Sequence, residues 1–326
     1  MAIQVRKEET PLYIAAAVEH VPRERVDNAH FARLTGREPA WFERRTGMRT
    51  RSRAAGGENT NSMALEAVAK LAASHDGLLA GTDLVIGASY TPWDTIGTLA
   101  HFVQRRFELR NARAVLLSSA CSSFIDSLEM AAAYIATGRA RTALIVAAEH
   151  NSLYARDEDS QSGHLWGDGA VAVLVTSRAP PSPALRILAT GAAGLAHVGA
   201  GPEGVRLEPR GAGLVMPHGK DVFHHACYGM EETSRALLQA HGMEASQLRL
   251  FIAHQANRRI IDHVAERMAL RPDQVATTLE ELGNTGCASA PITLARSWQK
   301  LRPGDAALMV VFGGGYSAGG VLLRAQ

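Results

Sequence analysis

The sequence predicts an α/β protein in which buried, mostly parallel strands alternate with amphipathic helices. Short apolar runs with the length of a strand recur along the chain. Stretches with apolar residues at helical spacing separate these runs, and polar or glycine-rich turns end them. Of the 326 residues, 46% are hydrophobic and 20% are charged, a balance typical of a globular protein with a substantial core.

The first half of the chain shows this alternation clearly. Residues 83–88 (DLVIGA) form an apolar run of strand length, and turn residues follow at 90–94. Residues 121–136 place apolar side chains on one helix face, and Thr137 and Gly138 form a stop signal. The predicted elements of this half are strands at 83–88, 112–117, 143–148 and 171–175, and helices at 97–107 and 121–136.

The second half shows the same rhythm, so we expect two similar halves at residues 1–178 and 179–326. Residues 180–217 are rich in glycine and proline, which predicts that they form the connection and a mobile surface loop. In both halves a reactive side chain follows a strand and precedes a helix. The further predicted elements are helices at 221–240, 257–268 and 283–301, and strands at 250–253, 307–312 and 320–324.

Composition and charge exclude several classes of function. A formal net charge of +2 does not favour nucleic-acid binding, and no apolar run is long enough for membrane insertion. The charged N-terminus lacks the apolar run of a signal peptide, so we expect a cytoplasmic protein. Three scattered cysteines suit reduced thiols better than disulfides or a zinc site. The basic residues 44–53 form either a solvated loop or a surface that meets phosphates or an acidic partner.

Cys121 stands where a buried strand meets a helix. Amide N–H groups and the helix dipole at such a position are expected to lower the pKa of the thiol and make the sulfur a nucleophile. The alternative is a small buried residue that only packs. Cys227 lies within a helix and is predicted to be structural, and Cys287 is predicted to pack near the site.

His254 follows an apolar strand, a position that points into the crevice where α/β sheets bind ligands. Taken alone it is as easily a structural histidine, but together with Cys121 it favours a Cys/His active site. Asn284 is either a turn residue or an amide donor that forms an oxyanion hole with His254. The glycines 313–315 let the backbone approach a ligand, so one of their N–H groups is expected to form a second hole with that of Cys121.

These motifs occur together in one order. The stretches are WFERRTGMR at 41–49, SSAC at 118–121, WGDGA at 166–170, AHQAN at 253–257, GNT at 283–285 and FGGG at 312–315. In order and spacing the sequence resembles the β-ketoacyl-ACP synthase III family, condensing enzymes of the thiolase superfamily, across nearly the whole chain. The resemblance implies a five-layered α-β-α-β-α thiolase fold of two similar halves, and a homodimer.

The resemblance also implies a reaction. Cys121 takes an acyl group from acyl-CoA while the backbone amides of Cys121 and Gly314 hold the oxyanion. A malonyl thioester, normally malonyl-ACP, then loses carbon dioxide, and His254 and Asn284 stabilise the enolate that attacks the acyl group. No metal and no permanently bound cofactor are needed, and the β-ketoacyl product serves fatty-acid initiation or specialised-metabolite biosynthesis. The alternatives are acyl transfer to an oxygen or nitrogen nucleophile without decarboxylation, and a silent subunit.

Family positions outside the triad imply two binding surfaces. Trp41 and Arg45 match residues that hold the adenine end of CoA, since tryptophan can stack on a base and arginine can pair with phosphate. Arg259 matches a residue on the surface that meets the acidic acyl carrier protein, and Arg258 adds charge beside it.

The acyl pocket is where the sequence departs from the family. Ile96 falls where a large aromatic residue often closes the pocket from the partner subunit, so a starter longer than acetyl is expected. Phe312 is assigned to the same pocket. Ser122 and Ser123 follow the nucleophile where small apolar residues are usual, and they either change the polarity of the pocket or cap the helix.

Overall fold

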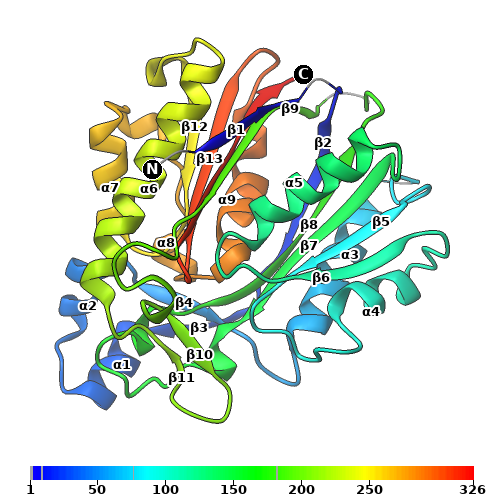
Figure 1. Ribbon diagram of the computed structural model, residues 1–326. Coiled ribbons are helices and arrows are strands. Elements are labelled where there is room, and N and C mark those ends of the chain that lie inside the picture. The colour runs from blue at the N-terminus through cyan, green and yellow to red at the C-terminus, as the bar shows by residue number, and fades with distance from the viewer. Residues whose placement is uncertain (1–2, 9, 76, 181–182) are drawn as a thin grey trace.

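The computed structural model describes residues 3–8, 10–75, 77–180 and 183–326 of the chain. Its main strands form one mixed sheet that consists of two half-sheets (Figure 1). The first half-sheet has the order β2-β8-β7-β5-β6, with β2 (Tyr13–His20), β5 (Leu84–Ala88), β6 (Arg113–Leu117), β7 (Thr142–His150) and β8 (Asp168–Thr176). The second has the order β12-β13-β14-β9, with β1 (Gln4–Lys7), β9 (Leu185–Gly194), β12 (Leu248–Ala253), β13 (Ala306–Gly313) and β14 (Ser317–Ala325).

Helices complete five layers, as the sequence predicts. Two helices cover the outer face of the first half-sheet, two lie between the half-sheets, and two cover the outer face of the second (Figure 1). In that order they are α3 (Thr60–Ser74) and α4 (Leu99–Arg106), α5 (Ser123–Ala136) and α9 (Ser289–Ser297), and α6 (Gly219–Ala240) and α7 (Arg258–Arg267). Shorter elements are α1 (Asn28–Thr35), α2 (Pro39–Thr46), α8 (Leu279–Leu282), and the two small antiparallel pairs β3 (Glu24–Asp27) with β4 (Thr50–Arg53) and β10 (Arg206–Glu208) with β11 (Gly213–Val215).

Separate apolar clusters fill the spaces between the layers. The central cluster packs α5 and α9 against both half-sheets, so these two helices are buried and rich in apolar residues. Burying a large aliphatic or aromatic side chain contributes roughly 1.5–3 kcal/mol, and the central layer concentrates such burial beneath the reactive end of α5. Examples are Phe124, Leu128 and Ile292 in the centre, Val68 and Leu71 beneath the first outer layer, and Leu237 and Phe251 beneath the second.

The N-terminal segment joins the two half-sheets. β1 pairs antiparallel with β9 from Gln4 opposite Ala192 to Lys7 opposite Ala189. The start of β2 continues along β9, with Ile14 opposite Leu185, and the strand then pairs with β8 of the first half-sheet. The first strand of the chain therefore belongs, by its hydrogen bonds, to the second half-sheet.

Two expectations about the sheet are wrong. The strands are not mostly parallel: β5–β6, β5–β7 and β12–β13 are parallel, whereas the pairs along β2, β8, β9 and β14 are antiparallel. The predicted loop at 180–217 contains the ten-residue strand β9 together with β10 and β11. Residues 181 and 182 of that segment lie outside the described part. The small residues of β9 suggest a loop, but Gly191 lies opposite Gly320 of β14, where an added Cβ atom would lie only 2.9 Å from Leu237 of α6.

The remaining predicted elements differ from the structure mainly at their ends. The helix predicted at 283–301 is divided into a 3-10 turn at Gly286–Ala288, α9, and a second 3-10 turn at Trp298–Lys300. Within the described residues, no helix has the length and apolar character that crossing a membrane requires.

Candidate active site

A tight turn between β6 and α5 presents Cys121. Ala120 has a φ of 52°, a left-handed conformation that is costly for a residue with a Cβ atom. The serines around the cysteine hold this turn: Ser122 Oγ donates to the carbonyl of Ser119 at 2.7 Å, and Ser123 Oγ donates to that of Ala120 at 2.6 Å. Both serines are buried and lie outside the lining of the pocket, which supports their role in the turn over a role in pocket polarity.

The glycine turn after β13 packs directly on this nucleophile turn. A Cβ atom on Gly313 would lie 3.0 Å from both the carbonyl oxygen of Ser119 and the amide nitrogen of Ser122. Only a glycine permits this close approach without a shift of the neighbouring backbone. The contact brings the next amide, that of Gly314, within hydrogen-bonding reach of the Cys121 sulfur, where it lowers the pKa of the thiol.

The predicted direction of the Cys121 pKa is nevertheless wrong. Burial raises the pKa of Cys121 to about 12, and the negative charge of Glu149 acts in the same direction. Hydrogen bonds from the backbone amides of Gly314 and Cys121 and from the Tyr90 side chain oppose the rise without cancelling it. The thiol is partly accessible from the pocket, and it is protonated at neutral pH.

His254 lies at the carboxyl end of β12, as the sequence predicts. Its amide donates to the carbonyl of Val310 on β13 at 2.8 Å, and its Nδ1 lies 2.8 Å from the hydroxyl oxygen of Ser289. The amide of Gln255 already donates to that oxygen, at 3.3 Å, so the hydroxyl hydrogen of Ser289 is free to reach Nδ1. This network favours the tautomer that carries its proton on Nε2. Burial lowers the pKa of His254 to about 4, so the ring is neutral at pH 7.

Asn284 is held by its own backbone and by the amide of Gly286. The carbonyl of Asn284 accepts from the amide of Gly167 at 2.9 Å, and its amide donates to Leu165 at 2.9 Å. Its side-chain oxygen accepts from the amide of Gly286 at 3.0 Å. Because the oxygen is occupied, the NH₂ group of the side chain is the end available to a ligand.

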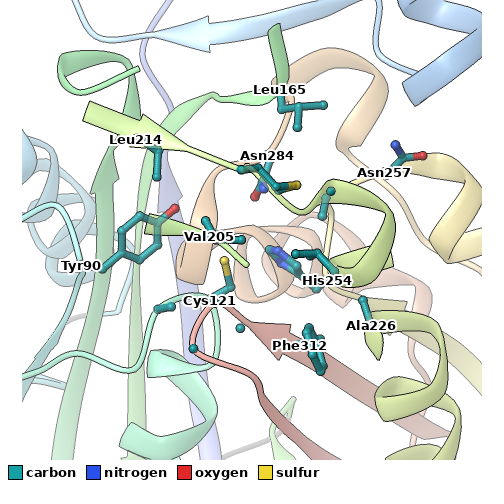
Figure 2. A pocket seen from close by; sticks show the side chains of 18 of the residues that line it. Tyr90, Cys121, Leu165, Val205, Leu214, Ala226, His254, Asn257, Asn284 and Phe312 are labelled. Carbon is teal, nitrogen blue, oxygen red and sulfur yellow. The ribbon is translucent and has the colours of Figure 1, made fainter. Parts of the chain in front are cut away.

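One pocket brings the three predicted catalytic residues together. The cavity has a volume of about 330 Å³, and Cys121, His254 and Asn284 all line it. Figure 2 shows the thiol, the imidazole ring and the carboxamide directed toward the same space. Phe312 and Gly314 line it as well, as predicted. The rest of the wall is largely apolar and includes Leu207, Leu214, Met216, Val222, Phe223 and Met230.

Sequence reasoning missed two polar residues beside the nucleophile. Tyr90, predicted only as a turn residue, lines the pocket. Glu149, at the end of β7, is fully buried and accepts hydrogen bonds from Ser89, from the amides of Tyr90 and Thr91, and from the hydroxyl of Thr91. Burial raises the pKa of Glu149 to about 7, against the effect of these donors. No local pattern marks either residue, because both act through contacts distant in sequence.

The other two cysteines occupy the places that the sequence predicts. The Sγ of Cys287 donates to Glu149 Oε1 at 2.9 Å, so this thiol packs beside the site. Cys227 is buried within α6 in the outer apolar cluster, which agrees with a structural role. Among the described residues, no group of three or more histidine, cysteine or acidic side chains is arranged to hold a metal ion.

Trp41 and Arg45 lie on α2, outside the pocket lining. The guanidinium carbon of Arg37 is 4.8 Å from the centroid of the Trp41 ring, and that of Arg45 is 5.3 Å from it. An indole flanked by two cations is suited to a flat, anionic group such as a nucleotide.

Arg51 and Arg53 of the basic run are structural, whereas Arg44 and Arg49 are exposed to solvent. Arg51 is fully buried and donates to Asn28 and to the carbonyl of His164, each at 2.6 Å, while Arg53 pairs with Asp157.

Arg258 and Arg259 start α7 beside α2, but only one of them is available to a partner. Arg258 pairs with Asp262 at 2.6 Å and with Glu280 at 2.8 Å. Arg259 makes one long contact of 3.5 Å to the carbonyl of Arg44. Ile96 is 87% exposed and does not line the pocket.

Comparison with known proteins agrees with this arrangement. Residues 117–194 match the family model of 3-oxoacyl-[acyl-carrier-protein (ACP)] synthase III, and residues 238–325 match the model of the C-terminal part of the same enzyme. The β-ketoacyl-[acyl-carrier-protein] synthase III of Roseiflexus castenholzii is 35% identical, over 93% of this chain and 95% of that protein.

Solved structures give the same result. The 3-oxoacyl-[acyl-carrier-protein] synthase III of Aquifex aeolicus superposes with a TM-score of 0.89 at 31% identity, covering 96% of this chain and 99% of that one. A priming β-ketosynthase from a polyketide biosynthetic pathway superposes with a TM-score of 0.85 at 28% identity, covering 98% of this chain and 97% of that one.

Proposed function

The chain belongs to the β-ketoacyl-[acyl-carrier-protein] synthase III family, condensing enzymes of the acyltransferase class, and from that premise we propose its reaction. We propose that Cys121 accepts an acyl group from acyl-CoA and that this group then condenses with malonyl-ACP to give a β-ketoacyl thioester. The observation that carries the proposal is the convergence of one thiol and two neutral N–H donors, His254 and Asn284, in one apolar pocket.

The first half-reaction moves the acyl group onto the enzyme. The sulfur of Cys121 attacks the thioester carbonyl, and the amides of Cys121 and Gly314 donate to the oxyanion that forms. The C–S bond to CoA then breaks, and the CoA sulfur leaves with the electron pair. The proton of the Cys121 thiol ends on the departing CoA, so the step releases no net proton.

The second half-reaction forms the carbon–carbon bond. The malonyl carboxylate leaves as carbon dioxide, and its electron pair passes to the thioester oxygen as an enolate. His254 Nε2–H and the Asn284 NH₂ group are the donors for that oxygen. Because the pKa of His254 is about 4, its ring is neutral at pH 7 and stabilises the enolate as a hydrogen-bond donor. The enolate carbon attacks the acyl carbon, and Cys121 leaves as the thiolate.

We assign the two substrates to adjoining surfaces. Trp41, Arg37 and Arg45 on α2 suit the nucleotide end of CoA, and the apolar wall of the pocket suits its pantetheine arm. Arg259 suits an acidic carrier protein, because its guanidinium has no carboxylate partner among the described residues. The partner that we infer for Ile96 is a second copy of the chain, whose acyl pocket it would border.

Intact-protein mass spectrometry tests the proposal. The wild type and Cys121→Ala are incubated with a panel of acyl-CoAs and then with malonyl-ACP that carries a ¹⁴C label in its free carboxyl group. We expect an adduct that requires Cys121 and is discharged with release of labelled carbon dioxide.

Each other outcome has a separate meaning. Discharge to an alcohol or amine without labelled carbon dioxide would replace condensation with acyl transfer. No adduct with any thioester would indicate a silent subunit and would overturn the proposed function.

A further inference from the structure

We propose that the pocket selects starter acyl groups that carry a neutral hydroxyl or oxo group close to the thioester, and that Tyr90 is the residue that recognises this oxygen. The inference rests on the proposed function and names its substrate class. It is carried by the buried Tyr90 hydroxyl, which lines the pocket near Cys121 and whose capacity for hydrogen bonds is not filled by the described residues.

Apart from its approach to the Cys121 sulfur and to the Asn151 side chain, the buried Tyr90 hydroxyl makes no hydrogen bond of ordinary geometry with the described residues. It points into the pocket, toward the space above the Cys121 thiol and beside Asn284 (Figure 2). A buried polar group without a partner is costly, and native proteins keep such groups mainly where a ligand completes them. A ligand oxygen in this space would accept the hydrogen bond that Tyr90 is free to donate.

Gly286 creates the space for the tyrosine. A Cβ atom on Gly286 would lie 2.6 Å from the Tyr90 hydroxyl oxygen and 2.8 Å from Cγ of Glu149. Its φ of 59° also favours a residue without a side chain. Any residue other than glycine at position 286 would therefore displace the Tyr90 hydroxyl. The amide of Gly286 also donates to the side-chain oxygen of Asn284.

A second unpaired group lies beside the hydroxyl. The side-chain oxygen of Asn151 is buried and lacks a partner among the described residues, although its NH₂ group donates to the carbonyls of Gly167 at 2.8 Å and Asn284 at 3.2 Å. Burial raises the pKa of Tyr90, the charges of Cys121 and Glu149 raise it further, and a hydrogen bond with the Asn151 side chain lowers it. Asn151 does not line the pocket, but a phenolic hydroxyl both donates and accepts, so Tyr90 alone matches the oxygen of an alcohol or of a ketone.

Charge and reach narrow the substrate class. Glu149 is fully buried in the same shell, and its charge opposes an anion on the acyl group, so carboxylated starters such as succinyl are disfavoured. The Tyr90 side chain hydrogen-bonds closely enough to Cys121 to affect the thiol. In the acyl-enzyme the hydroxyl is therefore within reach of the second and third carbons of the acyl chain, and not of its far end.

The test measures acylation of Cys121 alone, by quenched-flow mass spectrometry. The substrates are butyryl-CoA, each enantiomer of 3-hydroxybutyryl-CoA, 3-oxobutyryl-CoA and succinyl-CoA, which have the same four-carbon length. Tyr90→Phe removes only the hydroxyl, and Tyr134→Phe removes a hydroxyl from the far end of α5 as a matched control. Melting temperatures establish that both variants are folded.

We expect wild type and Tyr134→Phe to load one 3-hydroxy enantiomer and the 3-oxo substrate roughly tenfold faster than butyryl, with succinyl slowest. In Tyr90→Phe this advantage should disappear, so that the hydroxy, oxo and butyryl substrates load at similar rates. Equal loading of butyryl by the wild type would overturn the inference. An equal loss with every substrate in Tyr90→Phe would also overturn it, because the preference for the oxygenated substrates would then persist without the hydroxyl. Failure of the proposed function is distinct, since it appears as no adduct at all or as discharge without carbon dioxide.

Discussion

Replacing Ser289 with alanine should slow decarboxylation and leave acylation intact. The Ser289 hydroxyl is 2.8 Å from Nδ1 of His254, whose side chain is 4% exposed, so alanine would leave a buried ring nitrogen without its partner. Leaving such a group unpaired costs roughly 1 to 3 kcal/mol. Because about 1.4 kcal/mol corresponds to a factor of ten, release of carbon dioxide should slow by roughly 5- to 150-fold.

The assay separates the two half-reactions. Burst-phase mass spectrometry gives the rate of Cys121 acylation, and release of labelled carbon dioxide from malonyl-ACP by the acyl-enzyme gives the rate of the second step. Ser297→Ala, a buried serine at the other end of the same helix, controls for packing. An unchanged decarboxylation rate, or an equal loss in both steps, would refute a role for Ser289 in setting the tautomer of His254.

Three further predictions concern the surroundings of the site. Glu149→Gln should flatten the pH dependence of the free energy of unfolding. The pKa of Glu149 is about 7 in the folded state, above the ordinary 4.5, so its contribution to stability is present below pH 4.5 and is lost as the pH rises through 7. Chemical denaturation should show a loss of roughly 3 kcal/mol between pH 4 and 8 in the wild type, and an unchanged slope in the variant would contradict this. Arg259→Ala should raise KM for malonyl-ACP several-fold, and the effect should depend strongly on salt. Arg258→Ala should mainly lower the melting temperature, because the charge of Arg258 is already paired. Equal effects of the two substitutions on KM would argue against this distinction. Gly286→Ala should destabilise the fold by roughly 1–3 kcal/mol, because the new Cβ atom would meet the Tyr90 hydroxyl. Tyr90→Phe should restore part of this loss in a double-mutant cycle, and strictly additive effects would show that the two residues do not touch.

Much of the site follows from sequence because local rules place its residues. Cys121 and His254 each follow the carboxyl end of a strand, and such strand ends in an α/β fold face a common crevice. Asn284 and the glycines 313–315 lie in turns whose backbone conformation depends on their own residue types. These parts could be predicted because the determining information lies within a few residues of each position.

What could not be predicted depends on contacts across the fold. The pKa of Cys121 is set by burial and by Glu149, which is 28 residues away in sequence and on another strand. Tyr90 gains its place from the missing side chain of Gly286, and β9 is a strand because β1 and β14 pair with it. In each case the local sequence predicts the wrong pKa, side-chain role or secondary structure, because a segment distant in sequence determines it.

The pairing of β9 also determines when the enzyme can first act. During synthesis the N-terminal residues emerge first, yet β1 has no partner until β9 leaves the ribosome. The other neighbour of β9 is β14, the last strand of the chain, and the turn that carries Gly314 lies immediately before it. In a nascent chain, Cys121 is therefore synthesised long before the Gly314 amide that donates a hydrogen bond beside it. The residues through β14 must be synthesised before the thiol can work, so chains that stop before β14 should be catalytically silent.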